Sequence, residues 1–138
     1  MNYKELIIGD IVNIKCLNIE DEEVFLPGKI VSVGEDFVSA IAIYDTYQFE
    51  CPEIFEGVPL TAEILEKNRF IWKEDNGYFA LWLNDQDGIF ATPTRNGMWN
   101  VQAQSSQFKI SCNICYLHVL QHILRLFGLG DIADNFKI

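Results

Sequence analysis

One apolar helical stretch, the segment Asn113–Phe127, constrains the fold of this chain most. At about 100° per residue, its large apolar side chains gather on one side of a helix. These are Leu117, Leu120, Ile123, Leu124 and Phe127, widened by Tyr116, Val119 and Leu126. An apolar side of about half the circumference is too wide for a helix that rests on a surface. The stretch therefore predicts a helix wrapped by the β-rich sequence that precedes it.

Length and composition bound the class of protein. The chain has 138 residues, of which 49% are hydrophobic and 13% aromatic, enough for one ordinary core without disulfide bonds. No apolar run reaches the roughly 18 residues that a membrane span requires, because Arg125 interrupts the longest one. The first ten residues lack the apolar region of a signal peptide. We expect a cytoplasmic protein without a membrane segment, with its four cysteines reduced.

The charge is large and unevenly distributed. The net charge is −10, and residues 1–60 hold 12 acidic groups against three basic ones. Residues 61–138 carry eight acidic and seven basic groups, so they are nearly neutral. An acidic surface repels a phosphate backbone, which disfavours direct binding of nucleic acid. The acidic half favours plain solubility, and a basic protein partner or mimicry of nucleic acid are the alternatives.

Residues 1–56 show the pattern of short strands. Leu6–Leu17 alternates apolar and polar residues with period two, which is typical of a half-buried strand. Four further short strands are expected, with tight turns at Pro27-Gly28 and at Gly34-Glu35-Asp36. They are Val24–Leu26, Lys29–Val33, Phe37–Tyr44 and Tyr47–Cys51. This region predicts a small SH3-like antiparallel barrel sheet.

Residues 57–138 predict a helix, a β-meander and a second helix. Thr61 is a favourable N-cap for a helix that ends at Asn68-Arg69. Asn76-Gly77 and Asn96-Gly97 supply the positive φ angles of type I′ hairpin turns. The expected strands are Phe70–Lys73, Tyr78–Leu83, those flanking Asn84–Gly88 and Asn96-Gly97, and Phe108–Cys112. Gly128 and Gly130 should end the last helix before a short tail, so we expect an α+β fold whose two parts pack as one unit.

Three sequence blocks occur in a fixed order along the chain. They are EL-x-I-G-D-x-V at Glu5–Val12, G-V-P-L-T-x-E-I-L-E-K-N-x-F at Gly57–Phe70, and Y-L-H-x-L-Q at Tyr116–Gln121. On these blocks the chain resembles a family of small proteins carried by gut bacteria and their phages. The family has V-H-x-L-Q-N-L in the last block, where this chain has Leu117 before His118 and then Gln121-His122-Ile123. The resemblance implies no established activity, so no functional residue is carried over.

Cysteine and histidine cluster in Cys112-x-x-Cys115-x-x-His118-x-x-x-His122. Such residues are metal ligands in zinc fingers, where all four donors lie about 2.0–2.3 Å from the ion. On one helix, Cys115 and His122 are roughly 10 Å apart along the axis, which is too far for a shared ion. A partial site of Cys115, His118 and His122 remains an alternative, as does a redox Cys-x-x-Cys pair. We expect no metal or other cofactor, and interpret Cys112 and Cys115 as buried, small apolar thiols at the junction of a strand and the helix.

The helix predicted for Asn113–Phe127, here called the organising helix, has a polar arc opposite its apolar side. This arc consists of His118, Gln121, His122 and Arg125. It is either the solvated side of the helix, or it packs against polar backbone, or it contacts a partner. A catalytic histidine would need a nucleophile or carboxylate beside it, and no spacing in the sequence supplies one. The four residues are therefore candidate binding residues, and none is a candidate catalytic residue.

The predicted meander is rich in aromatic residues. In Tyr78–Leu83 both faces of the strand are apolar, because Tyr78, Ala80 and Trp82 alternate with Phe79, Leu81 and Leu83. One face should pack under a helix. The other either meets the N-terminal sheet or forms an exposed patch that binds a protein or stacks on a ligand. Trp82 is therefore the fifth candidate binding residue.

The sequence favours a non-catalytic interaction protein that binds another protein, such as an accessory protein of a phage or mobile element. The alternative is a metal-dependent regulator or enzyme that uses Cys112, Cys115, His118 and His122. Metal content of the purified protein would separate the two classes. The identity of the partner and the oligomeric state have no signature in the sequence.

Overall fold

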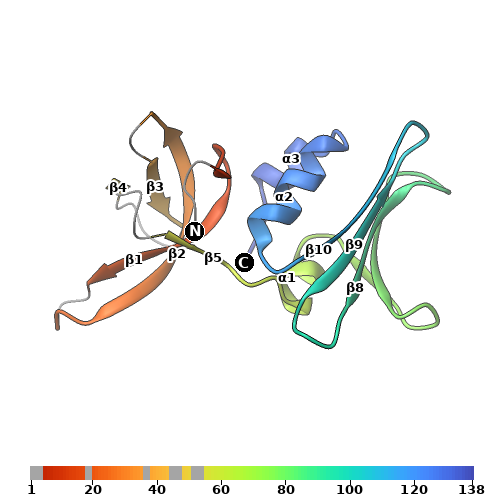
Figure 1. Ribbon diagram of the computed structural model, residues 1–138, viewed down its shortest axis with the longest axis horizontal. Coiled ribbons are helices and arrows are strands. Elements are labelled where there is room, and N and C mark those ends of the chain that lie inside the picture. Colours follow the sequence, from red (N-terminus) through yellow and green to blue (C-terminus); the bar gives the residue numbers. More distant parts are fainter. Residues whose placement is uncertain (1–4, 18–19, 36–37, 44–47, 51–54) are drawn as a thin grey trace. The chain divides into compact units, whose positions relative to one another are not determined.

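The computed structural model describes residues 5–17, 20–35, 38–43, 48–50 and 55–138. The chain divides into two compact units, residues 1–58 and 59–138. Both sheets are antiparallel and the fold is α+β, as expected from the sequence (Figure 1). Within the described ranges, no helix is long and apolar enough to span a membrane.

The first unit is an open antiparallel sheet in the order β4-β3-β2-β1-β5. Its strands are β1 (Ile11–Leu17), β2 (Glu23–Val33), β3 (Val38–Ala42), β4 (Gln48–Glu50) and β5 (Phe55–Gly57). Because β5 returns to pair with β1, the first and last strands of the unit are neighbours. The edges β4 and β5 do not pair in the part of the chain that the structure describes, so the sheet is not closed into the expected barrel.

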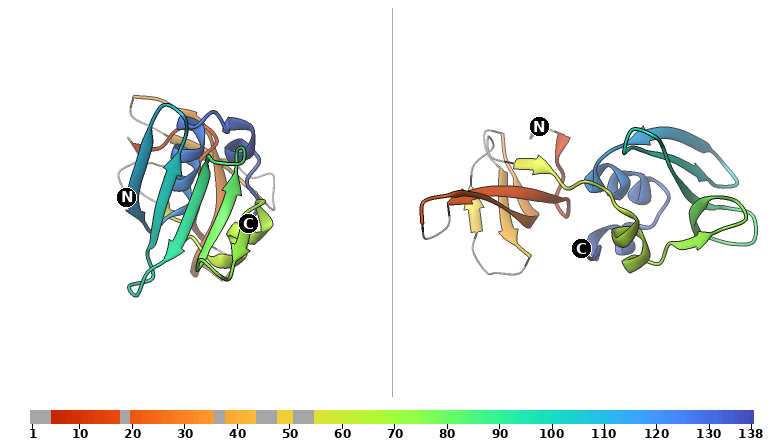
Figure 2. Two further views of the ribbon diagram at one scale, coloured as in Figure 1. Left: turned by 90° about the vertical axis from the view of Figure 1, so that its right-hand side faces the viewer. Right: turned by 90° about the horizontal axis from the view of Figure 1, so that it is seen from below.

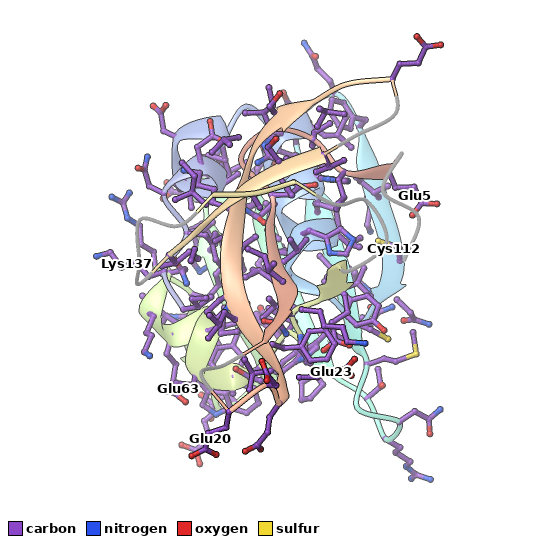
Figure 3. All side chains as sticks on the ribbon, turned by 90° about the vertical axis from the view of Figure 1, so that its left-hand side faces the viewer. Glu5, Glu20, Glu23, Glu63, Cys112 and Lys137 are labelled. Carbon is purple, nitrogen blue, oxygen red and sulfur yellow. The ribbon has the colours of Figure 1, made fainter. Side chains whose placement is uncertain are left out.

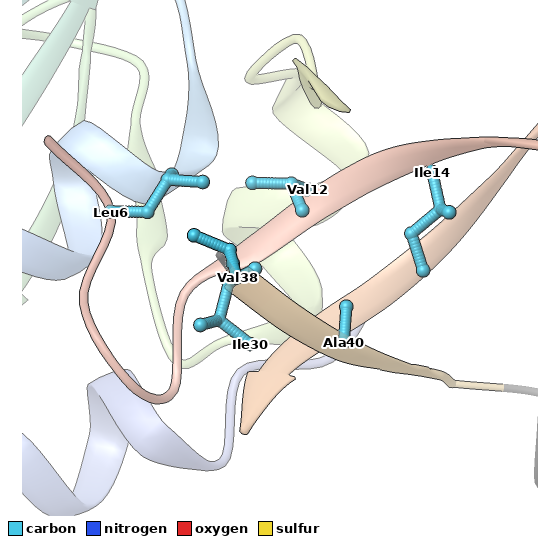
Figure 4. Close-up of a cluster of buried hydrophobic side chains, with 6 residues drawn as sticks. All are labelled: Leu6, Val12, Ile14, Ile30, Val38 and Ala40. Carbon is cyan, nitrogen blue, oxygen red and sulfur yellow. The ribbon is translucent and has the colours of Figure 1, made fainter. Parts of the chain in front are cut away.

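The core of this unit is aliphatic. Six buried side chains form it: Leu6, Val12, Ile14, Ile30, Val38 and Ala40 (Figure 4). They come from the segment before β1 and from alternate positions of β1, β2 and β3, as the period-two pattern requires. Gly9, at φ 97°, donates its amide to Ile30 O at 2.8 Å and so fixes the entry to β1.

The predicted turn at Pro27-Gly28 is wrong, because β2 runs unbroken through both residues. Pro27 pairs with Asn13, and its carbonyl accepts a hydrogen bond from Ile43 N at 2.9 Å. A Cβ atom at Gly28 would overlap the side chain of Ile14, so glycine serves close strand approach here. The predicted turn at Gly34–Asp36 and the predicted strands Phe37–Tyr44 and Tyr47–Cys51 extend outside the described residues.

The acidic residues before β2 lie at the end of the β1–β2 hairpin. Glu20 and Glu23 are both exposed there (Figure 3). Lys15 of β1 forms an ion pair with Glu23, with a separation of 3.0 Å between Nζ and Oε1. An exposed pair of this kind contributes about 0–1 kcal/mol, so the tip is held mainly by strand pairing.

The second unit places a five-stranded antiparallel sheet, ordered β10-β9-β8-β7-β6, next to three helices. Its elements are α1 (Ala62–Lys67), β6 (Ile71–Lys73), β7 (Tyr78–Trp82), β8 (Gly88–Pro93), β9 (Trp99–Gln104), β10 (Lys109–Ile114), α2 (Leu117–Leu126) and α3 (Gly130–Asp134). The helices cover one face of the sheet, here called the inner face, and leave the outer face uncovered within this unit (Figure 2, left).

Local sequence explains α1 well. Thr61 is the N-cap, and its hydroxyl accepts a hydrogen bond from Ile64 N at 3.2 Å, as predicted. Asn68 is the C-cap, and Arg69 follows with φ 72°. The buried residues of this segment include the predicted Leu60, Ile64, Leu65 and Phe70.

Both Asn-Gly turns are present, but they are not of type I′. That type needs a positive φ at both central residues, whereas Gly77 (φ 70°) and Gly97 (φ 73°) have it and the preceding asparagines do not. Gly77 N donates to Lys73 O at 2.8 Å, which closes a longer loop with glycine in the left-handed position. The hairpins form as expected by a different turn geometry.

The organising helix is shorter than predicted. Asn113 and Ile114 continue β10 and pair with Asn100 and Trp99 of β9. Extended pairing continues past the strand, since Leu60 N donates to Cys115 O at 2.9 Å and Pro59 bridges to Tyr116. Backbone pairing with the sheet therefore outweighs the helical periodicity of residues 113–116, and α2 begins only at Leu117.

Candidate functional site

The polar arc of α2 is not a solvated stripe. His118 is 4% exposed and Gln121 is fully buried, whereas the apolar Leu126 is 65% exposed. The buried side of the helix is thus rotated toward His118 relative to the prediction from apolar residues alone. Leu117, Leu120, Ile123 and Leu124 are buried as expected, whereas Tyr116 is exposed.

The short helix α3 explains the burial of Gln121. Gln121 Nε2 donates a hydrogen bond to Ala133 O at 2.8 Å, and Ala133 is fully buried. Arg125, on the same side of α2, forms an ion pair with Asp134 at 3.1 Å. The polar arc therefore packs on the backbone and the acidic end of α3, where the sequence had predicted only a tail. This is the second of the three readings open for the arc, packing against polar backbone.

Two aromatic rings, those of Tyr116 and His122, contact the ring of His118. Tyr116 stacks on His118 with ring centroids 5.9 Å apart and an interplanar angle of 13°. His122 meets His118 edge to face at 5.8 Å. His122 itself is half-buried. The two histidines thus lie on one helix side, as their i, i+4 spacing predicts.

Cys112 lies on a strand, as predicted for Phe108–Cys112, whereas Cys115 is not on the predicted helix, and both thiols are less buried than predicted. Cys112 lies on β10, and Cys115 lies in the extended segment between β10 and α2, so neither is on a helix. Both are free and half-buried. Burial raises the pKa of the Cys112 thiol above its ordinary value of 9.0, which disfavours the thiolate that binds metal or attacks a substrate. In the described part of the chain, no three His, Cys, Asp or Glu side chains are arranged to hold a metal ion.

The fifth candidate, Trp82, lies on the outer face of the second sheet. Its indole is 44% exposed and packs edge to face on Phe90 of the adjacent strand, with centroids 5.0 Å apart. Tyr78 packs on the other side of Phe90 at 5.2 Å. Beside Trp82 is an open depression of about 420 Å³, also lined by Leu83, Asn84 and Asp85. The three rings form one aromatic cluster across β7 and β8, in which Trp82 is exposed and Tyr78 and Phe90 are half-buried.

The strand register gives the rest of the outer face. Ala80 pairs with Phe90, Phe90 with Gln102, and Gln102 with Ser111, so these residues point to one side. By alternation the outer face consists of Ile71, Lys73, Tyr78, Ala80, Trp82, Gly88, Phe90, Thr92, Asn100, Gln102, Gln104, Lys109, Ser111 and Asn113. None of these outward strand positions is acidic, although the chain has 20 acidic residues.

Amide side chains dominate the half of the outer face that lies beside the aromatic cluster. Asn100 Nδ2 donates to Asn113 Oδ1 at 2.9 Å, which links β9 to β10 through side chains. Gln102 and Ser111, which form the next outward-facing pair along the same two strands, are exposed. This amide row was not predicted, although the alternation of polar and apolar residues within 100–104 and 109–113 indicates which side chains share its face.

Neither a protein-family model, nor a curated protein, nor a solved structure matches this chain.

Proposed function

We propose that the chain is a non-catalytic interaction protein that binds another protein through the outer face of the β6–β10 sheet, centred on Trp82. The single observation that carries this proposal is the composition of that face. It combines an aromatic cluster around the exposed Trp82 with amide side chains and has no acidic strand position, in a chain of net charge −10. The three sequence blocks support an accessory role in a phage or mobile element, in the cytoplasm.

Exposed tryptophan and tyrosine are the residues most often found at the centre of protein interfaces. Trp99 is 7% exposed because it is packed on the inner face. Trp82 has no such cover within this unit, so its indole is accessible to a partner. Asparagine and glutamine beside it can donate and accept hydrogen bonds with a polypeptide backbone. The outer strand positions hold no carboxylate, imidazole or thiol, so histidine, aspartate, glutamate and cysteine cannot act there as general acids or bases.

An SH3-like architecture for the first unit is part of the proposal. Support comes from five short antiparallel strands, from the return of β5 to β1, and from the irregular register of β2 between Ile30 and Ser32. Such an irregularity bends a strand and tightens the curvature of its sheet. In this proposal the first unit is an acidic companion of the binding unit.

Two tryptophans of nearly equal exposure provide a matched test. Trp82 (44% exposed) is on the outer face, and Trp72 (41% exposed) is on the adjacent edge strand with its ring against Phe79. A photo-crosslinking residue at Gln102 would capture the partner in an extract of the native cells for identification and purification. Trp82→Ala should then weaken the partner's affinity at least about tenfold, while Trp72→Ala should change it by less than about threefold.

Salt dependence distinguishes this face from the acidic hairpin tip. Binding at the outer face should change little between low and high ionic strength, because no charge pairs carry it. A Glu20/Asp21/Glu22/Glu23→Ser variant should keep its partner. Loss of the partner in that variant, with retention in Trp82→Ala, would show that the acidic sheet is the binding surface and that this proposal is wrong.

A further inference from the structure

A second depression in residues 59–138 lies between the end of α1 and α3. It has a volume of about 460 Å³. Lys67, Asn68 and Arg69 line it from the end of α1, and Asp131, Asn135 and Lys137 line it from α3 and the segment after it. This volume falls within the range of about 300–1,000 Å³ that is typical of small-molecule sites.

The lining is strongly basic for this protein. Lys67, Arg69 and Lys137 are three of the seven basic residues in the second unit, and among the described residues of the lining only Asp131 is acidic. The lining thus carries a formal charge of +2, from three basic residues and one acidic one, in a chain of net charge −10. A locally positive depression in an acidic protein concentrates anions at that place.

A buried amide fixes the geometry of the depression. Asn68 is 5% exposed, and its Nδ2 donates to Ile64 O and to Lys137 O, each at 2.7 Å. Its Oδ1 accepts a hydrogen bond from Lys137 N, also at 2.7 Å. These bonds hold two segments 69 residues apart in the sequence. They also occupy the carbonyl oxygens of Ile64 in α1 and of Lys137, which would otherwise repel an anion.

Arg69 has an unusual backbone for its residue type. It follows the C-cap of α1 with φ 72°, where glycine or asparagine is the ordinary residue. A bulky L-residue in this region costs about 1–2 kcal/mol. Strain of this kind is often retained where a side chain is needed at a particular place.

Two of the three basic groups are available to a ligand. Lys67 forms an ion pair with Glu63 at 3.1 Å. The side chains of Arg69 and Lys137 form no ion pair and no hydrogen bond with any residue that the structure describes. Lys137 projects from the unit in Figure 3. A planar guanidinium next to an ammonium group is a suitable pair for a tetrahedral oxyanion.

We infer that this depression, formed by Arg69, Lys137, Lys67 and Asn135, is a binding site for a small phosphomonoester. A phosphomonoester carries a charge of about −1.5 to −2 at pH 7, which is opposite to the charge of Arg69 and Lys137, the two available cations of the lining. The guanidinium of Arg69 supplies paired N–H donors and Lys137 supplies a point charge. Asn135 Nδ2 donates one hydrogen to Asp131 O at 2.8 Å, so it supplies its second hydrogen as a neutral donor. The carboxylate of Asp131 repels the anion and so lowers the affinity of the site for it.

The probes are inorganic phosphate, ribose 5-phosphate, and uncharged ribose as the control. We would follow amide chemical shifts of the full chain by NMR at constant ionic strength, with chloride as the competing anion. Phosphate and ribose 5-phosphate should shift the amides of residues 67–69 and 131–137, and ribose should shift none. Shifts spread equally over Lys73, Arg95 and Lys109 would show a general salt effect and overturn the proposal.

Single substitutions in the lining should change the affinity for phosphate in opposite directions. Arg69→Gln should weaken phosphate binding at least about tenfold, since it removes the charge and the paired N–H donors of the guanidinium group. Asp131→Asn should tighten binding several-fold, because it removes the acidic group that Asp131 contributes to the lining. Lys109→Gln, outside the depression, should leave the affinity unchanged and serves as the matched loss of charge. Unchanged or weaker binding in folded Asp131→Asn would overturn the proposed site.

Discussion

The two faces of the β6–β10 sheet use the same residue types for different purposes. On the inner face Trp99 is 7% exposed, and its indole Nε1 donates to Leu60 O at 2.8 Å. On the outer face Trp82 is 44% exposed, and its ring contacts are edge-to-face contacts with Phe90. The inner tryptophan is therefore fixed by burial and by a satisfied N–H group, and the outer one by a single aromatic neighbour.

This difference shows how apolar residues on both faces of a strand are to be interpreted. In β7, Phe79 and Leu81 are buried on the inner side, where the helices of the same unit lie (Figure 1). Tyr78 and Trp82 remain accessible on the other side. Burial of the inner residues stabilises the fold through the hydrophobic effect. The outer residues keep apolar area exposed, so that area does not stabilise this unit in the same way. The outer set is therefore where a binding function is expected.

The largest expected effect comes from replacing the inner tryptophan. Trp99→Ala should destabilise the protein by about 3–5 kcal/mol, because it leaves a cavity and an unpaired Leu60 carbonyl. Trp82→Ala should cost about 1 kcal/mol or less, since it removes an exposed ring. Urea unfolding followed by circular dichroism measures both without relying on tryptophan fluorescence. Equal costs at the two positions would show that the faces are assigned wrongly.

A smaller effect is expected from the buried polar arc of α2. Gln121→Leu keeps a similar side-chain volume but leaves Ala133 O without its donor, which should cost about 1–3 kcal/mol. His122→Ala, on the half-buried part of the same arc, should cost less than about 1 kcal/mol. Unfolding in urea compares the two variants directly. A neutral Gln121→Leu would mean that α3 does not depend on this hydrogen bond.

Local sequence signals predicted the elements whose geometry depends on a few neighbouring residues. The Thr61 cap of α1 and the alternation that begins β1 are of this kind. The start of α2 and the helix α3 were mispredicted, because each depends on partners distant in sequence. Asn113 pairs with Asn100, and a five-residue α3 is too short to be stable without packing on α2.

The residues of the candidate site also differ in whether local sequence predicts them. Trp82 was identified from the alternation within one strand. The burial of Gln121 was not settled, since packing of the polar arc against backbone was one of three alternatives and only α3 supplies its partner. The amide row of Asn100, Gln102 and Asn113 requires the register of two strands to be known. Sequence patterns thus assign faces within an element, but not the surfaces that several elements build together.

The smallest expected effect concerns Cys112. It follows the outward-pointing Ser111 on β10, so alternation places its side chain on the inner face. Burial raises the pKa of its thiol, so the folded protein favours the protonated form. A raised pKa contributes stability that is fully present below the unfolded pKa and is lost as pH rises through the folded pKa. The contribution of Cys112 should therefore be constant at neutral pH and decrease only in alkaline solution.

Alkylation kinetics measure this directly. Cys112 should react with iodoacetamide more slowly in the folded protein than in urea, and its rate should rise with pH at a higher midpoint than in the unfolded chain. Mass spectrometry of the labelled peptide distinguishes it from Cys115. Cys112→Val should change the free energy of unfolding by less than about 1 kcal/mol, since a half-buried thiol is replaced by a side chain of similar size. Faster alkylation in the folded state, or zinc that is lost together with stability in the Cys112→Val variant, would show that this thiol is reactive rather than part of the packed inner face.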